Sequence, residues 1–117
     1  MGLNHWGESD GAADFVYTYK EATTMAKRRK LIDTELKDFA NNYNTPGSVN
    51  IALAIEGGIL RKEDLTEVQL YTLRDLLTEL KVKSSAKYRK EWSDESGRIE
   101  HNNAYKRLLK AVKVDLN

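Results

Sequence analysis

Apolar side chains recur along this chain at intervals of three, four and seven residues, which is the spacing of one face of an α-helix. The first such block covers residues 12–43 and contains neither glycine nor proline. The pattern predicts one long N-terminal helix, or two helices joined by a bend near residues 28–30. The apolar positions of the block are Ala22, Met25, Ile32, Leu36, Phe39 and Tyr43.

Polar residues mark both ends of this block. Ser9 or Asp10 is placed to cap its start, because a short polar side chain there accepts hydrogen bonds from free backbone N–H groups. Asp14 lies in the first turn, where the helix dipole favours a negative charge. Asparagine, proline and glycine over residues 41–47 end the block, because these residue types prefer turns.

The second apolar block, residues 49–56, is apolar on nearly every side. A helix of this composition belongs in the centre of a core, although so short a run is also typical of a buried strand. If the block is a helix, Ser48 is its expected cap, and Gly57 is the expected left-handed residue after its last turn.

The clearest helix start in the chain is at Thr66. Gln69 follows three residues later, which is the spacing of a capping box, and Leu65 and Leu70 have the spacing of a hydrophobic staple. Leucines on one stripe then predict a helix that extends to about Lys83.

Beyond this helix, two serines and the polar residues 93–97 predict loops, with another turn or two of helix between them. The last helix is expected over residues 99–114. Its inward side chains are Tyr105, Leu108, Leu109 and Val112.

Together these elements predict an all-α fold, a compact four- to five-helix bundle with a long N-terminal helix. A chain of 117 residues has the size of one domain, so we expect a single helical domain over 1–117, with a loop segment over 1–11. Charged residues are 32% of the chain, which is polar for this size. A homodimer, which would bury more surface, therefore stays open as an alternative.

Composition excludes several kinds of chemistry. Without cysteine there is no disulfide, thiolate zinc site or cysteine nucleophile. No phosphate-binding glycine loop, nucleophile elbow or two-histidine metal helix occurs, so we expect no enzyme, no catalytic residue, no metal and no cofactor. The chain lacks a signal-peptide pattern and an apolar stretch that would span a bilayer, so we expect a cytoplasmic protein without a membrane partner.

The first candidate site is the N-terminal segment. Its chemically distinctive residues are His5, Trp6, Asp10 and Asp14. Capping and the helix dipole already account for the two acids, and a metal needs three or four converging ligands. We therefore interpret the segment as an aromatic anchor for a partner, with a structural latch or a small-ligand or nucleotide site as the alternatives.

A resemblance adds to this interpretation. Trp6-Gly7 is followed by the run Ser9-Asp10-Gly11-Ala12-Ala13-Asp14-Phe15. With these motifs, about the first fifteen residues resemble the opening of a family of small uncharacterised bacterial and phage proteins, which begin with Gly-x-Trp-Gly and an acidic stretch leading to Ala-x-Asp and then Phe or Trp. In this chain the Trp-Gly pair is nearer to the Asp-Phe pair. The resemblance implies a small, mostly helical fold and no particular activity.

Two basic regions are further candidates. Arg28, Arg29 and Lys30 form a cluster for an acidic partner, a phosphate or a nucleotide, or simply an exposed helix face balanced by nearby acids. Residues 81–117 carry ten Lys and Arg against five Asp and Glu. Basic side chains neutralise phosphates and aromatic rings stack on bases, or else the region is the solvated face of a bundle. The candidate nucleic-acid residues are Lys87, Arg89, Lys90, Trp92, Lys106, Arg107, Lys110 and Lys113.

The sequence therefore predicts a small, non-enzymatic interaction protein that binds another macromolecule, with a protein as the first choice. One version is a phage-type accessory protein that modulates a host factor. The alternatives are nucleic-acid binding through the basic C-terminal third, and small-ligand or nucleotide binding at the N-terminal segment. Salt-dependent retention on DNA or RNA tests the first alternative, and thermal shifts with nucleotides and divalent ions test the second.

Overall fold

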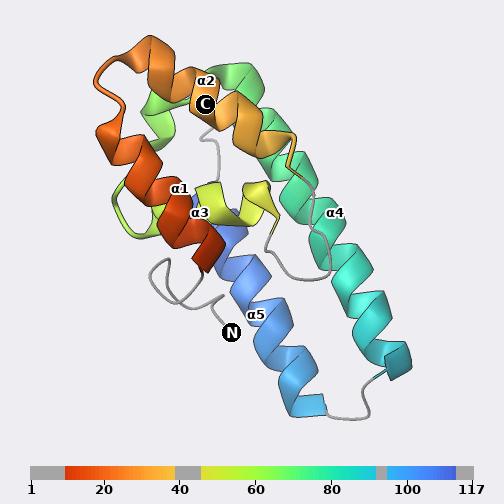
Figure 1. The fold of residues 1–117 in the computed structure, drawn as a ribbon. Helices are drawn as coiled ribbons and strands as arrows, with labels where there is room; N and C mark the ends of the chain where they lie inside the picture. Colours follow the sequence, from red (N-terminus) through yellow and green to blue (C-terminus); the bar gives the residue numbers. More distant parts are fainter. Residues whose placement is uncertain (1–9, 39–45, 92–94, 113–117) are drawn as a thin grey trace.

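The computed structural model describes residues 10–38, 46–91 and 95–112, with side chains except those of residues 10 and 83–102. In this part of the chain five α-helices and one short 3-10 helix follow one another without a strand (Figure 1). They are α1 Asp10–Glu21, α2 Met25–Leu36, α3 Gly47–Glu56, η2 Lys62–Asp64, α4 Glu67–Glu91 and α5 Glu95–Ala111. The predicted all-α bundle of four to five helices is confirmed.

Helix α3 is the centre of the bundle. It contacts α1, α2, α4 and α5, and its residues 47–54 are all buried. A helix that is apolar on every side is stable only where other elements surround it. Residues 49–56 are therefore helical, and the alternative of a strand is wrong.

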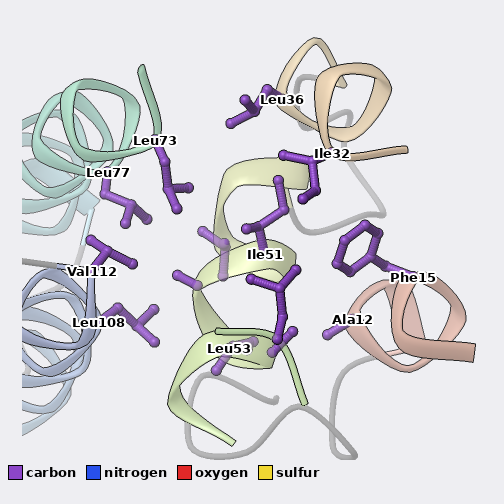
Figure 2. Close-up of a cluster of buried hydrophobic side chains, with 14 of the residues drawn as sticks. Ala12, Phe15, Ile32, Leu36, Ile51, Leu53, Leu73, Leu77, Leu108 and Val112 are labelled. Carbon is purple, nitrogen blue, oxygen red and sulfur yellow. The ribbon is translucent and has the colours of Figure 1, made fainter. Parts of the chain in front are cut away.

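The core is built around this central helix, as Figure 2 shows. Ile51 and Leu53 lie at its middle, with the side chains of α4 and α5 on one side and those of α1 and α2 on the other. The predicted core-facing residues Leu108 and Val112 are fully buried, whereas Leu109 is partly buried.

The N-terminal block is two helices rather than one long helix. The break lies at residues 22–24, ahead of the expected bend at residues 28–30. Thr24 has an extended backbone, and its hydroxyl oxygen accepts a hydrogen bond from the backbone N–H of Lys27 at 3.2 Å. This N-cap starts α2 afresh, so Met25 is 40% exposed instead of lying in the core.

Two turn predictions around α3 are wrong in detail. The N-cap position is Pro46, which makes no side-chain cap, and Ser48 lies buried inside the helix. Gly57 stays right-handed with φ −76°, whereas Gly58 has φ +77° and is the left-handed residue. The left-handed residue after α3 is therefore one position later in the chain than predicted.

The start of α4 is as predicted. The backbone N–H of Gln69 donates to the Thr66 hydroxyl at 3.1 Å, and the backbone N–H of Thr66 donates to Oε1 of Gln69 at 2.9 Å. These reciprocal bonds confirm the capping box.

The later boundaries differ from the prediction. Helix α4 continues through both serines to Glu91, and α5 begins at Glu95, so residues 95–97 are helical rather than loop. The two helices pack along each other as an antiparallel pair (Figure 1). Such tertiary packing overrides the weak helix propensity of serine and glycine.

Candidate functional site

The structure describes only part of the N-terminal candidate. His5 and Trp6 lie outside the described residues, so the choice between an anchor and a latch stays a prediction. Asp10 is the first residue of α1, and Asp14 is exposed on that helix. Phe15, in contrast, is buried in the core, with its ring centroid 5.9 Å from that of Tyr19.

The structure separates the three members of the basic cluster. The Arg28 guanidinium lies 4.8 Å from the centroid of the Tyr19 ring, and its Nε donates to the carbonyl oxygen of Ala22 at 3.1 Å. Nε of Arg29 donates to the carbonyl oxygen of Asp64 at 3.4 Å. The two arginines therefore join α2 to its neighbours, and Arg29 and Lys30 are both exposed.

A buried carboxylate lies next to these arginines. Oδ2 of Asp64 accepts hydrogen bonds from the Tyr19 hydroxyl at 3.5 Å and from the Arg61 backbone N–H at 3.3 Å. The Arg61 guanidinium is 3.7 Å from the other carboxylate oxygen. Burial, and then the negative charge of Asp64, raise the pKa of the Tyr19 hydroxyl above 10.0.

Gln69 connects this cluster to α4. Its side-chain Nε2 donates to the carbonyl oxygen of Arg29 at 3.0 Å and to Oδ1 of Asp33 at 2.7 Å. The same residue also closes the capping box, so one buried amide ties the start of α4 to α2. The sequence indicated the cap but not the two contacts with α2, because Asp33 and Arg29 lie 36 and 40 positions before Gln69 in the chain.

A second polar contact joins α2 to α3. Nδ2 of Asn50, a buried residue, donates to Oε1 of Glu35 at 2.9 Å. Burial raises the pKa of the Glu35 carboxyl above its ordinary value of 4.5; the hydrogen bond from Asn50 lowers it, and the charge of Asp38 raises it further. Burial is the largest of these effects, so the ionised form is disfavoured in the folded protein.

Glu35→Gln should therefore change how stability depends on pH. The pKa of the Glu35 carboxyl is higher in the folded than in the unfolded protein, so wild type loses stability as pH rises from below 4.5 to neutral. The variant has no carboxyl at this position and does not lose this stability. Glutamine keeps the oxygen that accepts from Asn50. We expect the free energy of unfolding of the variant, relative to wild type, to be higher at pH 7 than at pH 4.

Urea unfolding at both pH values measures this difference. Glu79→Gln, which removes the same charge from an exposed position on α4, controls for net charge. An equal pH response of the two variants would contradict the role of burial at Glu35.

The basic C-terminal candidates are described only in part. Lys106 and Lys110 are exposed one turn apart on α5, whereas the Arg107 side chain forms an ion pair with Glu56 of α3. The remaining candidates lie where side chains are not described: Lys87, Arg89, Lys90, Trp92 and Lys113. Nucleic-acid binding through this region stays a prediction.

The structure also reveals a surface that the sequence analysis missed, which we call the outer face of α4. Helix α4 forms one edge of the molecule (Figure 1), with α2, α3 and α5 packed on its inner side. Val68 and Val82 are 75% and 64% exposed on the opposite side. The outer face comprises Val68, Tyr71, Thr72, Asp75, Thr78, Glu79 and Val82.

The sequence shows the two valines of this surface, but it shows that they are exposed only once the buried side of α4 is known. Leu73 and Leu77 are fully buried and define the inner side of α4. Once that side is known, the two valines fall on the other side, because successive residues are 100° apart around a helix. Tyr71 is half-buried on the outer face, about one turn after Val68, and the Arg74 guanidinium lies 6.0 Å from its ring centroid.

The described part of the chain holds no group of three or more histidine, cysteine, aspartate or glutamate side chains arranged to bind a metal ion. None of its helices is both long and apolar enough to cross a membrane. Comparisons of the chain with models of known families, with curated proteins and with solved structures give no match.

Proposed function

We propose that this chain is a non-enzymatic protein-binding module and that the outer face of α4 is its binding surface. The observation that carries the proposal is the exposure of Val68 and Val82 on one side of the same helix. Valine is a poorer helix former than alanine, and its exposed side chain is not part of the core. Burial in the core therefore does not account for either residue, and a partner that covers both is the explanation that we propose.

The surroundings of the two valines support this function. Tyr71 lies between them, and tyrosine is enriched at interfaces because it combines a large apolar ring with a polar tip. Threonine and acidic side chains lie among the apolar residues of the outer face, as polar groups accompany apolar ones in protein interfaces. The outer face from Val68 to Val82 is about 21 Å long at 1.5 Å per residue.

Replacing both valines with lysine should abolish partner binding without unfolding the chain. In an affinity pull-down, we expect a protein that wild type retains to be reduced at least tenfold by Val68→Lys/Val82→Lys, because a partner that covers these positions would then have to enclose two ammonium groups. Both positions are exposed, so circular dichroism should show an unchanged helix content.

The matched control is Lys27→Glu/Lys30→Glu, a pair of charge changes at exposed positions on α2. It should retain the same protein as wild type. If all three forms of the chain retain the same proteins in the same amounts, the outer face of α4 is not the binding surface.

A further inference from the structure

The buried amide of Asn50, on the central helix α3, has an oxygen without a partner. Asn50 is 3% exposed, and its Nδ2 donates to Oε1 of Glu35 at 2.9 Å, whereas its enclosed Oδ1 accepts no hydrogen bond. Among the side chains that the structure describes, no other buried nitrogen or oxygen lacks a hydrogen bond. A buried acceptor left unpaired destabilises the fold, so this oxygen needs an explanation.

We propose that Glu35 supplies the missing hydrogen bond when its carboxyl is protonated, and that the two side chains then hold α2 on α3 more tightly. An ionised carboxylate has two acceptor oxygens and no donor, so it leaves Oδ1 of Asn50 unpaired. A protonated carboxyl has an acceptor and an O–H donor, and an amide offers the complementary pair. With Nδ2 bonded to Oε1, the O–H on Oε2 donates to Oδ1 and closes a ring of two hydrogen bonds. Glu35 is only half-buried, so the proton can come from solvent.

This pair lies at a close contact between the two helices. A Cβ atom on Gly47, one turn before Asn50, would lie 3.0 Å from Cγ of Glu35. The backbone N–H of Gly47 donates to the carbonyl oxygen of Asp38 at 2.9 Å, which holds the end of α2 beside the start of α3. The Glu35 side chain therefore leaves α2 directly against α3. A second hydrogen bond at this point strengthens the contact between the helices in acid.

The surroundings of Glu35 favour the protonated form. Burial raises the pKa of its carboxyl, and the negative charge of Asp38 raises it further. The hydrogen bond that Nδ2 of Asn50 donates acts in the other direction, because it stabilises the ionised form. The second hydrogen bond, to Oδ1, stabilises the protonated form alone. It therefore opposes the first.

The ionisable residues of the helices packed on α2 are engaged elsewhere. Helix α3 has Glu56 as its one ionisable residue, and this side chain forms an ion pair with α5. Helix α1 contacts α2 at Arg28, about two turns before Glu35. Helix α4 contacts it at Asp33, which is about 200° around α2 from Glu35. Among the described residues, Asp38 is therefore the charge that acts on the Glu35 carboxyl.

Asn50→Leu tests the proposal, because leucine has a similar size and removes both halves of the amide. The protonated form of Glu35 then loses two hydrogen bonds, whereas the ionised form loses one bond together with the unpaired Oδ1. We expect the acid dissociation constant of Glu35 to rise roughly threefold or more, which is a fall in its pKa. A nuclear magnetic resonance titration of the Glu35 carboxyl carbon measures it. Thr34→Val, which removes a hydroxyl from the exposed side of α2, should leave the constant as in wild type.

An acid dissociation constant that is unchanged or smaller in Asn50→Leu would overturn the proposal, because Asn50 would then act on Glu35 only through the bond from Nδ2. If Asn50→Leu does not fold, Glu35→Gln decides. Its amide has the acceptor and the donor of a protonated carboxyl. We expect a scalar coupling across the hydrogen bond from the new Nε2 to Cγ of Asn50. Absence of this coupling in the folded variant would show that Oδ1 receives no hydrogen bond from residue 35.

Discussion

Gly47→Ala should destabilise the protein by roughly 3 kcal/mol or more, which is the upper end for overpacking a close contact. A Cβ atom at residue 47 would lie 1.7 Å from the carbonyl oxygen of Glu35 and 2.7 Å from its carbonyl carbon. Both are backbone atoms of α2 and cannot turn aside as a side chain does. Helices α2 and α3 must therefore separate, which disrupts the packing around the central helix. Urea unfolding followed by circular dichroism measures the loss.

Gly58→Ala is the control for this variant. Gly58 has φ +77° and no atom within 4 Å of a Cβ built on it, so the substitution introduces backbone strain without a clash. We expect a loss of about 1 kcal/mol, the cost of holding alanine in a left-handed conformation. Equal losses at the two positions would show that the contact between α2 and α3 is not the reason for glycine at residue 47.

Leu77→Ala is expected to cost about 3 kcal/mol, because it removes a side chain from the closed centre of the core and leaves a cavity. Leu77 is fully buried and points toward α5, where Leu108 and Val112 lie (Figure 2). Helix α5 packs mainly on α4, so the loss should appear as one cooperative shift in the unfolding midpoint. Thermal or urea unfolding measures it.

The same helix offers a matched control in Val82→Ala. Val82 is 64% exposed, so its truncation leaves no cavity, and alanine is the better helix former. We expect a change of no more than about 0.5 kcal/mol, in the stabilising direction. A loss above about 1 kcal/mol would show that Val82 supports the fold, and the proposal that it serves a partner would lose its main support.

Features that arise from residues close together in the chain could be predicted from the sequence alone. The helical class follows from apolar spacing and from the long stretches without glycine or proline. The capping box at Thr66 and Gln69 could be predicted because both of its hydrogen bonds join residues three positions apart. The apolar composition of residues 49–56 likewise indicated the centre of the core, since such a segment is stable only when it is enclosed.

Which side of each helix is buried, and against which neighbour, depends on the tertiary packing. Arg28 and Arg29 form a basic cluster in the sequence, yet their guanidinium groups contact Tyr19 and the backbone of Asp64. Gly47 looks like an ordinary turn residue until α2 passes within contact distance of it. Periodicity shows that a helix has an apolar side but not which neighbour covers it, because that depends on contacts between residues far apart in the chain. For the same reason, the exposure of Val68 and Val82 became visible only when α3 and α5 were seen to cover the opposite side of α4.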